Sequence, residues 1–182
     1  AEVSTERDVD KIVDTIKSFV EDYNSMIAKL NGYTHEKATY KEYAPLTEAQ
    51  KKEMTEKEIE LWEEKAKEGL LRSDTNINRF LSDMRTAMYT RGDSKYVLSN
   101  IGINTSSEWT DFGKLTIDED ALKNALTKDP NGVKALFVGD NGLATKLNNI
   151  CSKTANTSSG NPGTLVQMAG VEGCLLYTSP SP

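Results

Sequence analysis

The sequence has few of the residues that most catalytic and metal sites need. Its 182 residues include only two cysteines, Cys151 and Cys174, and one histidine, His35. The spacing of the cysteines matches neither a zinc motif nor a disulfide framework, so we expect two free thiols. A single histidine in a polar segment is unsuited to a zinc site or to Ser-His-Asp or Cys-His catalysis. We therefore predict no catalytic residue, no cofactor-binding residue and no metal ligand, and a protein that is not an enzyme.

Basic clusters and long apolar runs are also missing. The net charge is −6 and no stretch is strongly basic, so nucleic acid is not an expected partner. No apolar run approaches the roughly 20 residues of a membrane span, and no conventional signal peptide opens the chain. Hydrophobic residues make up 37% of the chain. That fraction is modest for a globular core, which other segments or subunits could complete.

The clearest predicted helix covers residues 8–30. A wide apolar stripe at i, i+3, i+4 and i+7 spacing indicates an amphipathic helix that needs another long helix beside it. Asn31-Gly32 is a plausible stop, because glycine tolerates the left-handed cap conformation. The stripe consists of Val9, Ile12, Val13, Ile16, Phe19, Val20, Tyr23, Ile27 and Leu30.

Two capping signatures follow a polar, tyrosine-bearing loop. Thr47 precedes Gln50 by three residues, and Thr55 precedes Glu58 by three residues. In each pair the hydroxyl can accept from a free backbone N–H while the Gln or Glu side chain reaches back. The signatures predict a short helix over residues 48–54 and a longer one over 56–68.

The longer of these helices carries one of the two tryptophans, Trp62, among charged residues. Ile59, Trp62 and Ala66 form a narrow stripe, and the charged side chains form a solvated face with many i, i+3 and i, i+4 pairs. We expect Trp62 to be a buried anchor against another helix, and Leu70-Leu71, after Gly69, to turn inward.

Downstream, Ser73 or Asp74 is expected to cap an amphipathic helix that Gly92 ends. Its methionines are interpreted as core residues rather than as an adaptable binding groove. Short strands are then predicted at 97–98, 101–103 and 109–117, with the alternation of "GKLTID" indicating a β-hairpin. Further helices are predicted after Asp118, at Pro130 and from Leu143, followed by a flexible Ser/Thr/Asn-rich loop over residues 152–163.

Acidic clusters could suggest a hydrolase with paired carboxylates. Asp118, Glu119 and Asp120 are consecutive, and Glu60, Glu63 and Glu64 share one segment. Consecutive acids at a helix start are better explained by capping and by the helix dipole. The "GDNGLAT" turn lacks the alternating acids of a calcium loop, and no glycine-rich phosphate loop is present.

Several stretches in order resemble one protein family, the bacterial flagellar filament cap proteins, also called hook-associated protein 2. The similarity covers residues 8–173 and matches the carboxy-terminal region of the family. Each piece alone is a weak signal, whereas the ordered set is specific. The pieces are "FVEDYNSMIAKL" (19–30), "YAPLTEAQKKEMTEKEIELWEEKAKEGLLRSD" (43–74), "IGI" (101–103), "GKLTIDEDAL" (113–122), "DPNGVKALF" (129–137) and "GLATKLN" (142–148).

The resemblance implies a protein of the bacterial flagellum that caps the filament tip and promotes flagellin polymerisation. It implies a homo-oligomeric ring, with flagellin, hook-filament junction proteins and a flagellar export chaperone as partners. It also implies an extracellular location reached through the flagellar secretion system, and in some bacteria adhesion to host surfaces. An extracellular adhesin or binding module without a capping role is the alternative.

The expected fold class is α+β, a helical leg domain with long amphipathic helices, a small β-hairpin and short capping helices. We predict that residues 1–151 form part of the leg domain. Residues 152–173 are expected to be a flexible Ser/Thr/Asn/Gly-rich connection toward a missing stalk helix with coiled-coil spacing. Residues 174–182, "CLLYTSPSP", are expected to be a non-native tail, because the prolines forbid helix and no heptad follows.

Overall fold

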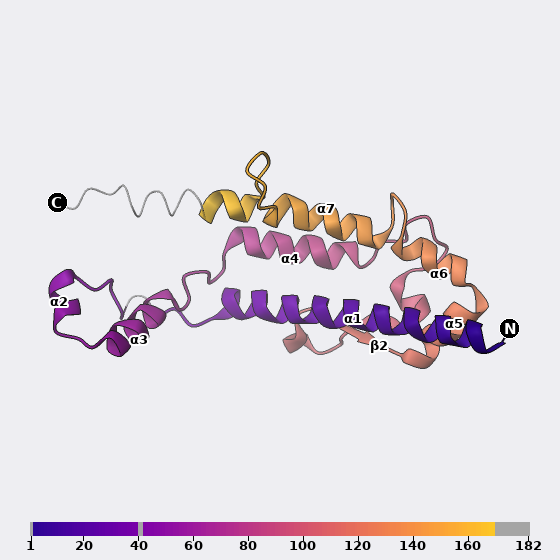
Figure 1. Cartoon of the computed structure of the whole chain (residues 1–182), viewed down its shortest axis with the longest axis horizontal. Helices are drawn as coiled ribbons and strands as arrows, with labels where there is room; N and C mark the ends of the chain where they lie inside the picture. Colours follow the sequence, from indigo (N-terminus) through magenta and orange to yellow (C-terminus); the bar gives the residue numbers. More distant parts are fainter. Residues whose placement is uncertain (1, 40–41, 170–182) are drawn as a thin grey trace.

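The computed structural model describes residues 2–39 and 42–169, with side chains from residue 8 onward. It confirms the α+β class, with helices dominating and one two-stranded antiparallel sheet. Figure 1 shows an elongated body in which the long helix α1 runs beneath α4 and α7. The helices are α1 (Glu2–His35), α2 (Glu48–Lys52), α3 (Glu56–Lys67), α4 (Thr75–Ala87), α5 (Glu119–Lys128), α6 (Pro130–Phe137) and α7 (Leu143–Ala155). The remaining elements are the 3₁₀ turns η1 (Leu98–Ile101) and η2 (Trp109–Asp111) and the strands β1 (Ile103–Thr105) and β2 (Leu115–Ile117).

Helix α1 is longer than the sequence predicts. The expected stop at Asn31-Gly32 is wrong, because the helix continues to His35. The Asn31 side chain is buried and its Nδ2 donates to the carbonyl of Ile27, 2.8 Å away. A glycine inside a helix costs only about 1 kcal/mol relative to alanine, so packing of the last turn outweighs that cost. The last turn is held where the His35 ring lies 4.5 Å from the Phe112 ring.

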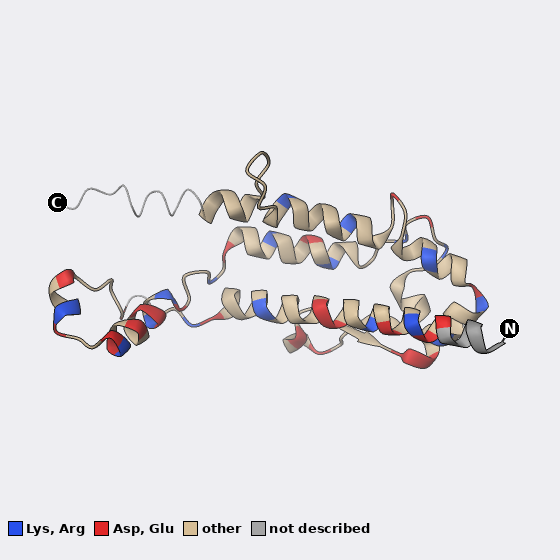
Figure 2. Cartoon of the chain, viewed as in Figure 1, with Lys and Arg blue, Asp and Glu red and all other residues tan. Residues whose placement is uncertain are grey.

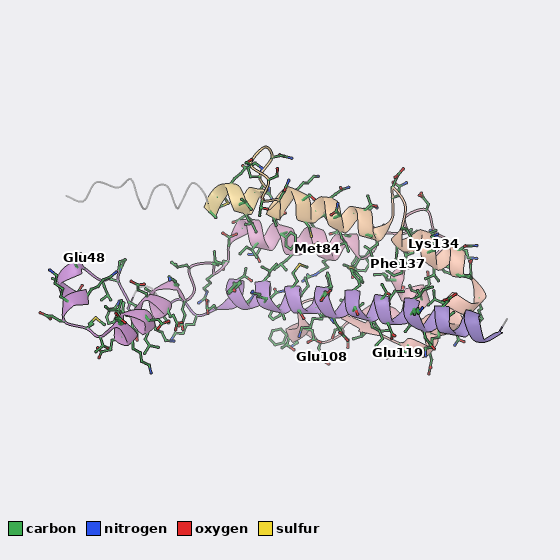
Figure 3. The ribbon with its side chains drawn as sticks, viewed as in Figure 1. Glu48, Met84, Glu108, Glu119, Lys134 and Phe137 are labelled. Carbon is green, nitrogen blue, oxygen red and sulfur yellow. The ribbon has the colours of Figure 1, made fainter. Side chains whose placement is uncertain are left out.

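One continuous apolar core joins α1, α4, α5, α6, α7 and the hairpin. Met84 lies between α4 and α1 (Figure 3), and together with Met88 it fills the core as predicted. The buried core residues are Val13, Ile16, Val20, Tyr23, Ile27, Ile77, Phe80, Leu81, Met84, Ala87, Met88, Leu98, Ile101, Ile103, Leu115, Leu122, Leu126, Val133, Leu136, Leu143 and Leu147.

The hairpin pairs β1 with β2 in the register Ile103 to Ile117. The strand predicted at 97–98 is wrong, since Val97 caps the 3₁₀ turn η1 and Leu98 lies within it. The strand predicted from residue 109 begins only at Leu115, and Trp109 lies exposed in η2. Runs of two or three apolar residues carry too little periodicity to distinguish a strand from a turn.

The outer edge of β2 is closed by a side chain of α1. Asn24 Oδ1 accepts from the N–H of Leu115 at 2.7 Å, and Asn24 Nδ2 donates to the carbonyl of Leu115 at 2.8 Å. The amide thus makes the two hydrogen bonds that a neighbouring strand would make. This contact fixes the hairpin to α1 at one point of its length.

Helix starts follow the predicted local signals. Both capping boxes form, and Thr55 and Thr47 each exchange hydrogen bonds with the residue three positions on. Asp74, rather than Ser73, caps α4 by accepting from the N–H groups of Asn76 and Ile77. Asp118 caps α5, and Pro130 occupies the first turn of α6.

Helices α2 and α3 form an arm, residues 42–74, that projects beyond the end of α1 (Figure 1). Neither of these helices buries a residue, and Figure 2 shows acidic and basic residues along the ribbon of α3. Trp62 is half-buried against a loop, not a helix. Its Nε1 donates to the Ala44 carbonyl at 2.8 Å, and its ring lies 4.9 Å from that of Tyr43. The expectation of a helical neighbour is therefore wrong within this chain.

The inward turn predicted for Leu70 and Leu71 is also wrong. Leu70 is 60% exposed and Leu71 is 43% exposed. The segment instead turns at Gly69, whose φ of +77° belongs to the left-handed region that glycine favours.

We expect Trp62→Ala to destabilise the arm by about 1–2 kcal/mol, the sum of one aromatic pair and one hydrogen bond. Amide exchange of α3 measures this local opening directly. Trp62→Phe keeps the ring contact but loses the N–H donor, so its effect should be about half as large. A loss of 3 kcal/mol or more would show that Trp62 is buried in the assembled protein.

The Ser/Thr/Asn-rich segment is shorter than predicted, because α7 extends to Ala155. Residues 156–163 form a closed turn in which the Gly163 N–H donates to the Asn156 carbonyl at 2.7 Å. A further helix begins at Thr164 and is described to residue 169. The predicted tail at 174–182, with Cys174, lies outside the described residues.

Candidate packing and assembly surfaces

Three of the six carboxylates that could suggest a hydrolase, Asp118, Glu119 and Glu63, are engaged in structural contacts. Glu119 lies 2.6 Å from Lys17 Nζ, and Glu63 lies 3.0 Å from Lys51 Nζ. Asp118 is the cap of α5. The hydrogen bond and charge of Lys17 lower the pKa of Glu119, and those of Lys51 lower the pKa of Glu63. A general acid needs a raised pKa, so these pairs have the opposite character.

Metal-binding and nucleophilic residues do not converge in the described part of the chain. No group of three or more His, Cys, Asp or Glu side chains is placed there to hold a metal ion. His35 Nδ1 lies at the end of α1, 2.9 Å from the Asn31 carbonyl. Cys151 is half-buried, and burial raises the pKa of its thiol, which disfavours the reactive thiolate. Among the same described residues, no helix is long and apolar enough to cross a membrane.

One concave surface of the body is an apolar groove between α1, α6 and α7, with a volume of 540 Å³. We call it the α1–α6–α7 groove. Ile12 and Phe19 line it from α1, Phe137 from α6 and Leu147 from α7. Figure 3 places Lys134 and Phe137 on α6, at the end of the body away from the arm.

This groove leaves apolar side chains open to solvent. Ile12 belongs to the helix stripe but is 42% exposed, and Val138 is 52% exposed. The Phe19 and Phe137 rings meet edge to face at 6.4 Å across its floor. An apolar surface of this kind is typical of a packing or interaction site.

Comparison with known proteins identifies the family. The family described as "Flagellar hook-associated protein 2 C-terminus" matches residues 1–169. Flagellar hook-associated protein 2 of Halalkalibacterium halodurans is 42% identical over 134 residues, covering 71% of this chain and 25% of that protein. The Thermotoga maritima protein of the same name is 34% identical over 173 residues, covering 91% of this chain and 25% of that protein.

A solved structure agrees with the sequence comparisons. The chain resembles the crystal structure of the flagellar cap protein FliD, D1-D2-D3 domains, from Escherichia coli, with a TM-score of 0.59 and 26% identity. The match covers 88% of this chain and 35% of that one. These matches, together with the helices packed on a small hairpin, place the chain among the proteins of the bacterial flagellum. The chain belongs to the flagellar hook-associated protein 2 family and spans about a quarter of the length of the curated relatives that it matches.

Sequence reasoning missed the α1–α6–α7 groove. The spacing placed Ile12 and Phe19 in the apolar stripe of α1. It does not distinguish the residues of the stripe that pack against α4 from those that line the solvent-exposed groove. The width of the stripe was the available signal, because nine apolar residues cover more surface than a single neighbouring helix can bury.

Proposed function

We propose that this chain is the leg-domain part of a protein that caps the tip of the flagellar filament and promotes flagellin polymerisation. The family match over residues 1–169 is the single observation that carries the proposal. The likeness to a protein whose title names it a flagellar cap protein supports it. The protein then works outside the cell after export by the flagellar secretion system. It acts as a homo-oligomeric ring that meets flagellin and the hook-filament junction proteins, with an export chaperone before assembly.

The α1–α6–α7 groove supports a leg domain that another part of the same protein completes. The curated relatives are about four times as long as the matched region. At 540 Å³ the groove has room for several side chains of a packed helix, and its lining is apolar. Covering Ile12, Phe19 and Phe137 would remove exposed apolar surface, which stabilises by about 25 cal/mol per Å² buried.

Complementation tests the proposal. The full-length protein should restore swimming to a bacterium that lacks its own cap protein, and flagellin should remain in filaments instead of appearing in the medium. Phe137→Glu places a charge in the groove and should abolish this activity, whereas Leu61→Glu, on the exposed face of α3, should preserve it.

The outcome that contradicts capping is specific. A full-length protein that is exported and folded but leaves flagellin in the medium is not a cap. If that protein binds glycans or host cells, the adhesin alternative replaces the capping role.

A further inference from the structure

A second groove, which we call the arm groove, lies where the α2–α3 arm joins the body. Its volume is 900 Å³, and its walls come from the end of α1, the end of α3, the start of α4 and the helix after Thr164. Four large apolar side chains of its lining are exposed, Tyr33, Leu70, Leu71 and Met168. The arm groove and the α1–α6–α7 groove share no lining residue.

The backbone on both sides of Leu70 and Leu71 is anchored to the end of α1. The Gly69 N–H donates to Glu36 Oε2 at 2.9 Å, and the Ser73 N–H donates to the Thr34 carbonyl at 3.0 Å. A Cβ on Gly69 would lie 2.4 Å from Ala38 Cα, so the turn also requires glycine by close approach. The backbone on both sides of Leu70 and Leu71 is thus fixed, and the two side chains are presented without a large ordering cost.

The rim of the arm groove is acidic. Glu36 and Asp74 accept from backbone N–H groups, and neither forms an ion pair within 4.0 Å among the described side chains. Glu64 lines the groove and has no ion-pair partner within 4.0 Å among the described side chains. Glu68 is paired with Lys65, which does not line the groove. Lys67 is the one cation among the described residues of the lining. Three acids without an ion pair, Glu36, Glu64 and Asp74, against one lysine give the described rim a net negative charge around an apolar floor.

We propose that the arm groove binds an amphipathic helix of a partner protein, with an apolar face between Lys or Arg side chains. The apolar floor accepts the face of such a helix, and the acidic rim pairs with its basic flanks. The lining described here consists of helices and the turn after Gly69, so an added strand would find no strand edge to pair with. The inference concerns a different surface from the α1–α6–α7 groove and does not depend on the capping role.

A designed peptide tests the proposal on the full-length protein. The probe is a fluorescent 14-residue helix with leucine at i, i+3, i+4 and i+7 spacing and flanking lysines, and its partner peptide has glutamate in place of lysine. The lysine peptide should bind at least about tenfold more tightly in fluorescence anisotropy, a difference of about 1.4 kcal/mol. Leu70→Asp should remove most of that binding, and Glu64→Lys should reduce the preference for the lysine peptide.

Leu61→Asp is the matched control, because Leu61 is 54% exposed on α3 but does not line the groove. Equal binding of both peptides, or an equal loss in Leu61→Asp, overturns the proposal. Thiol labelling of Leu70→Cys in a background with Cys151→Ser and Cys174→Ser gives a second measurement. Protection of that thiol in the full-length monomer, together with no peptide binding, would show that the rest of the polypeptide fills the groove, which also overturns it.

Discussion

Leu136→Ala is expected to lower the free energy of unfolding by about 2–5 kcal/mol, the range for a large-to-small change in a packed core. Leu136 is 0% exposed on α6 and belongs to the apolar core that joins several helices, so its truncation should leave a cavity. Urea unfolding followed by circular dichroism measures the loss. An unchanged m-value would show that the loss lies in stability and not in the extent of the cooperative unit.

Val138→Ala is the matched control for this prediction. Val138 follows Leu136 by two residues but is 52% exposed, so its truncation should cost less than about 1 kcal/mol. If the remainder of the protein covers the α1–α6–α7 groove, the cost of Val138→Ala should be larger in the full-length protein than in this chain. Equal effects of the two substitutions in this chain would contradict the assignment of Leu136 to the core.

Local signals account for the elements that the sequence predicts well. Thr55 and Glu58 satisfy each other's backbone groups over three residues, and Asp118 reaches Ala121 over the same distance. Such contacts need no knowledge of the rest of the fold. The apolar faces of α4 and α5 were predictable for a similar reason. Helical spacing alone places Ile77 and Phe80 on one face of α4, and Leu122 on the apolar face of α5.

Contacts between distant segments account for what the sequence does not predict. The extension of α1 depends on packing of its last turn beside Phe112, which is 77 residues away in the chain. The exposure of Leu70 and Leu71 depends on how Gly69 meets Ala38, and the loop contact of Trp62 depends on Ala44. The spacing of apolar residues predicts that a helix face is buried, but it does not identify the segment that packs against that face.

The two grooves differ in the chemistry of their linings and in their place on the molecule. The α1–α6–α7 groove is apolar and lies on the body, and it resembles a core face that lacks one helix. The arm groove has an acidic rim and lies at the base of a projection that buries none of the residues of α2 or α3. Helices α2 and α3 bury no residue, so the arm adds little to the apolar core. We therefore propose that the first groove is covered within the whole protein and that the second binds a partner.

Asn24→Ala is expected to destabilise the protein by roughly 2–4 kcal/mol, since it leaves one donor and one acceptor of the Leu115 backbone without partners. Leu115 is buried, so water cannot easily replace the lost amide. Asn104→Ala is the control, because Asn104 is exposed on β1 and only its backbone takes part in a described hydrogen bond. Urea unfolding should separate the two variants clearly, and equal stability would contradict the strand-like role of the Asn24 amide.

Asn24→Asp distinguishes the two hydrogen bonds by pH. A carboxylate at this position can accept from the Leu115 N–H but repels the Leu115 carbonyl, so the pKa of the introduced carboxyl should be raised in the folded state. The folded state then holds its proton more tightly than the unfolded state. The penalty should therefore be smallest below the unfolded pKa of about 4 and should grow as the pH rises through the raised folded pKa. Unfolding free energies of Asn24→Asp and Asn24→Ala at pH 3.5 and 7.5 measure this difference. A constant gap between the two variants would show that the Leu115 carbonyl does not depend on the Asn24 donor.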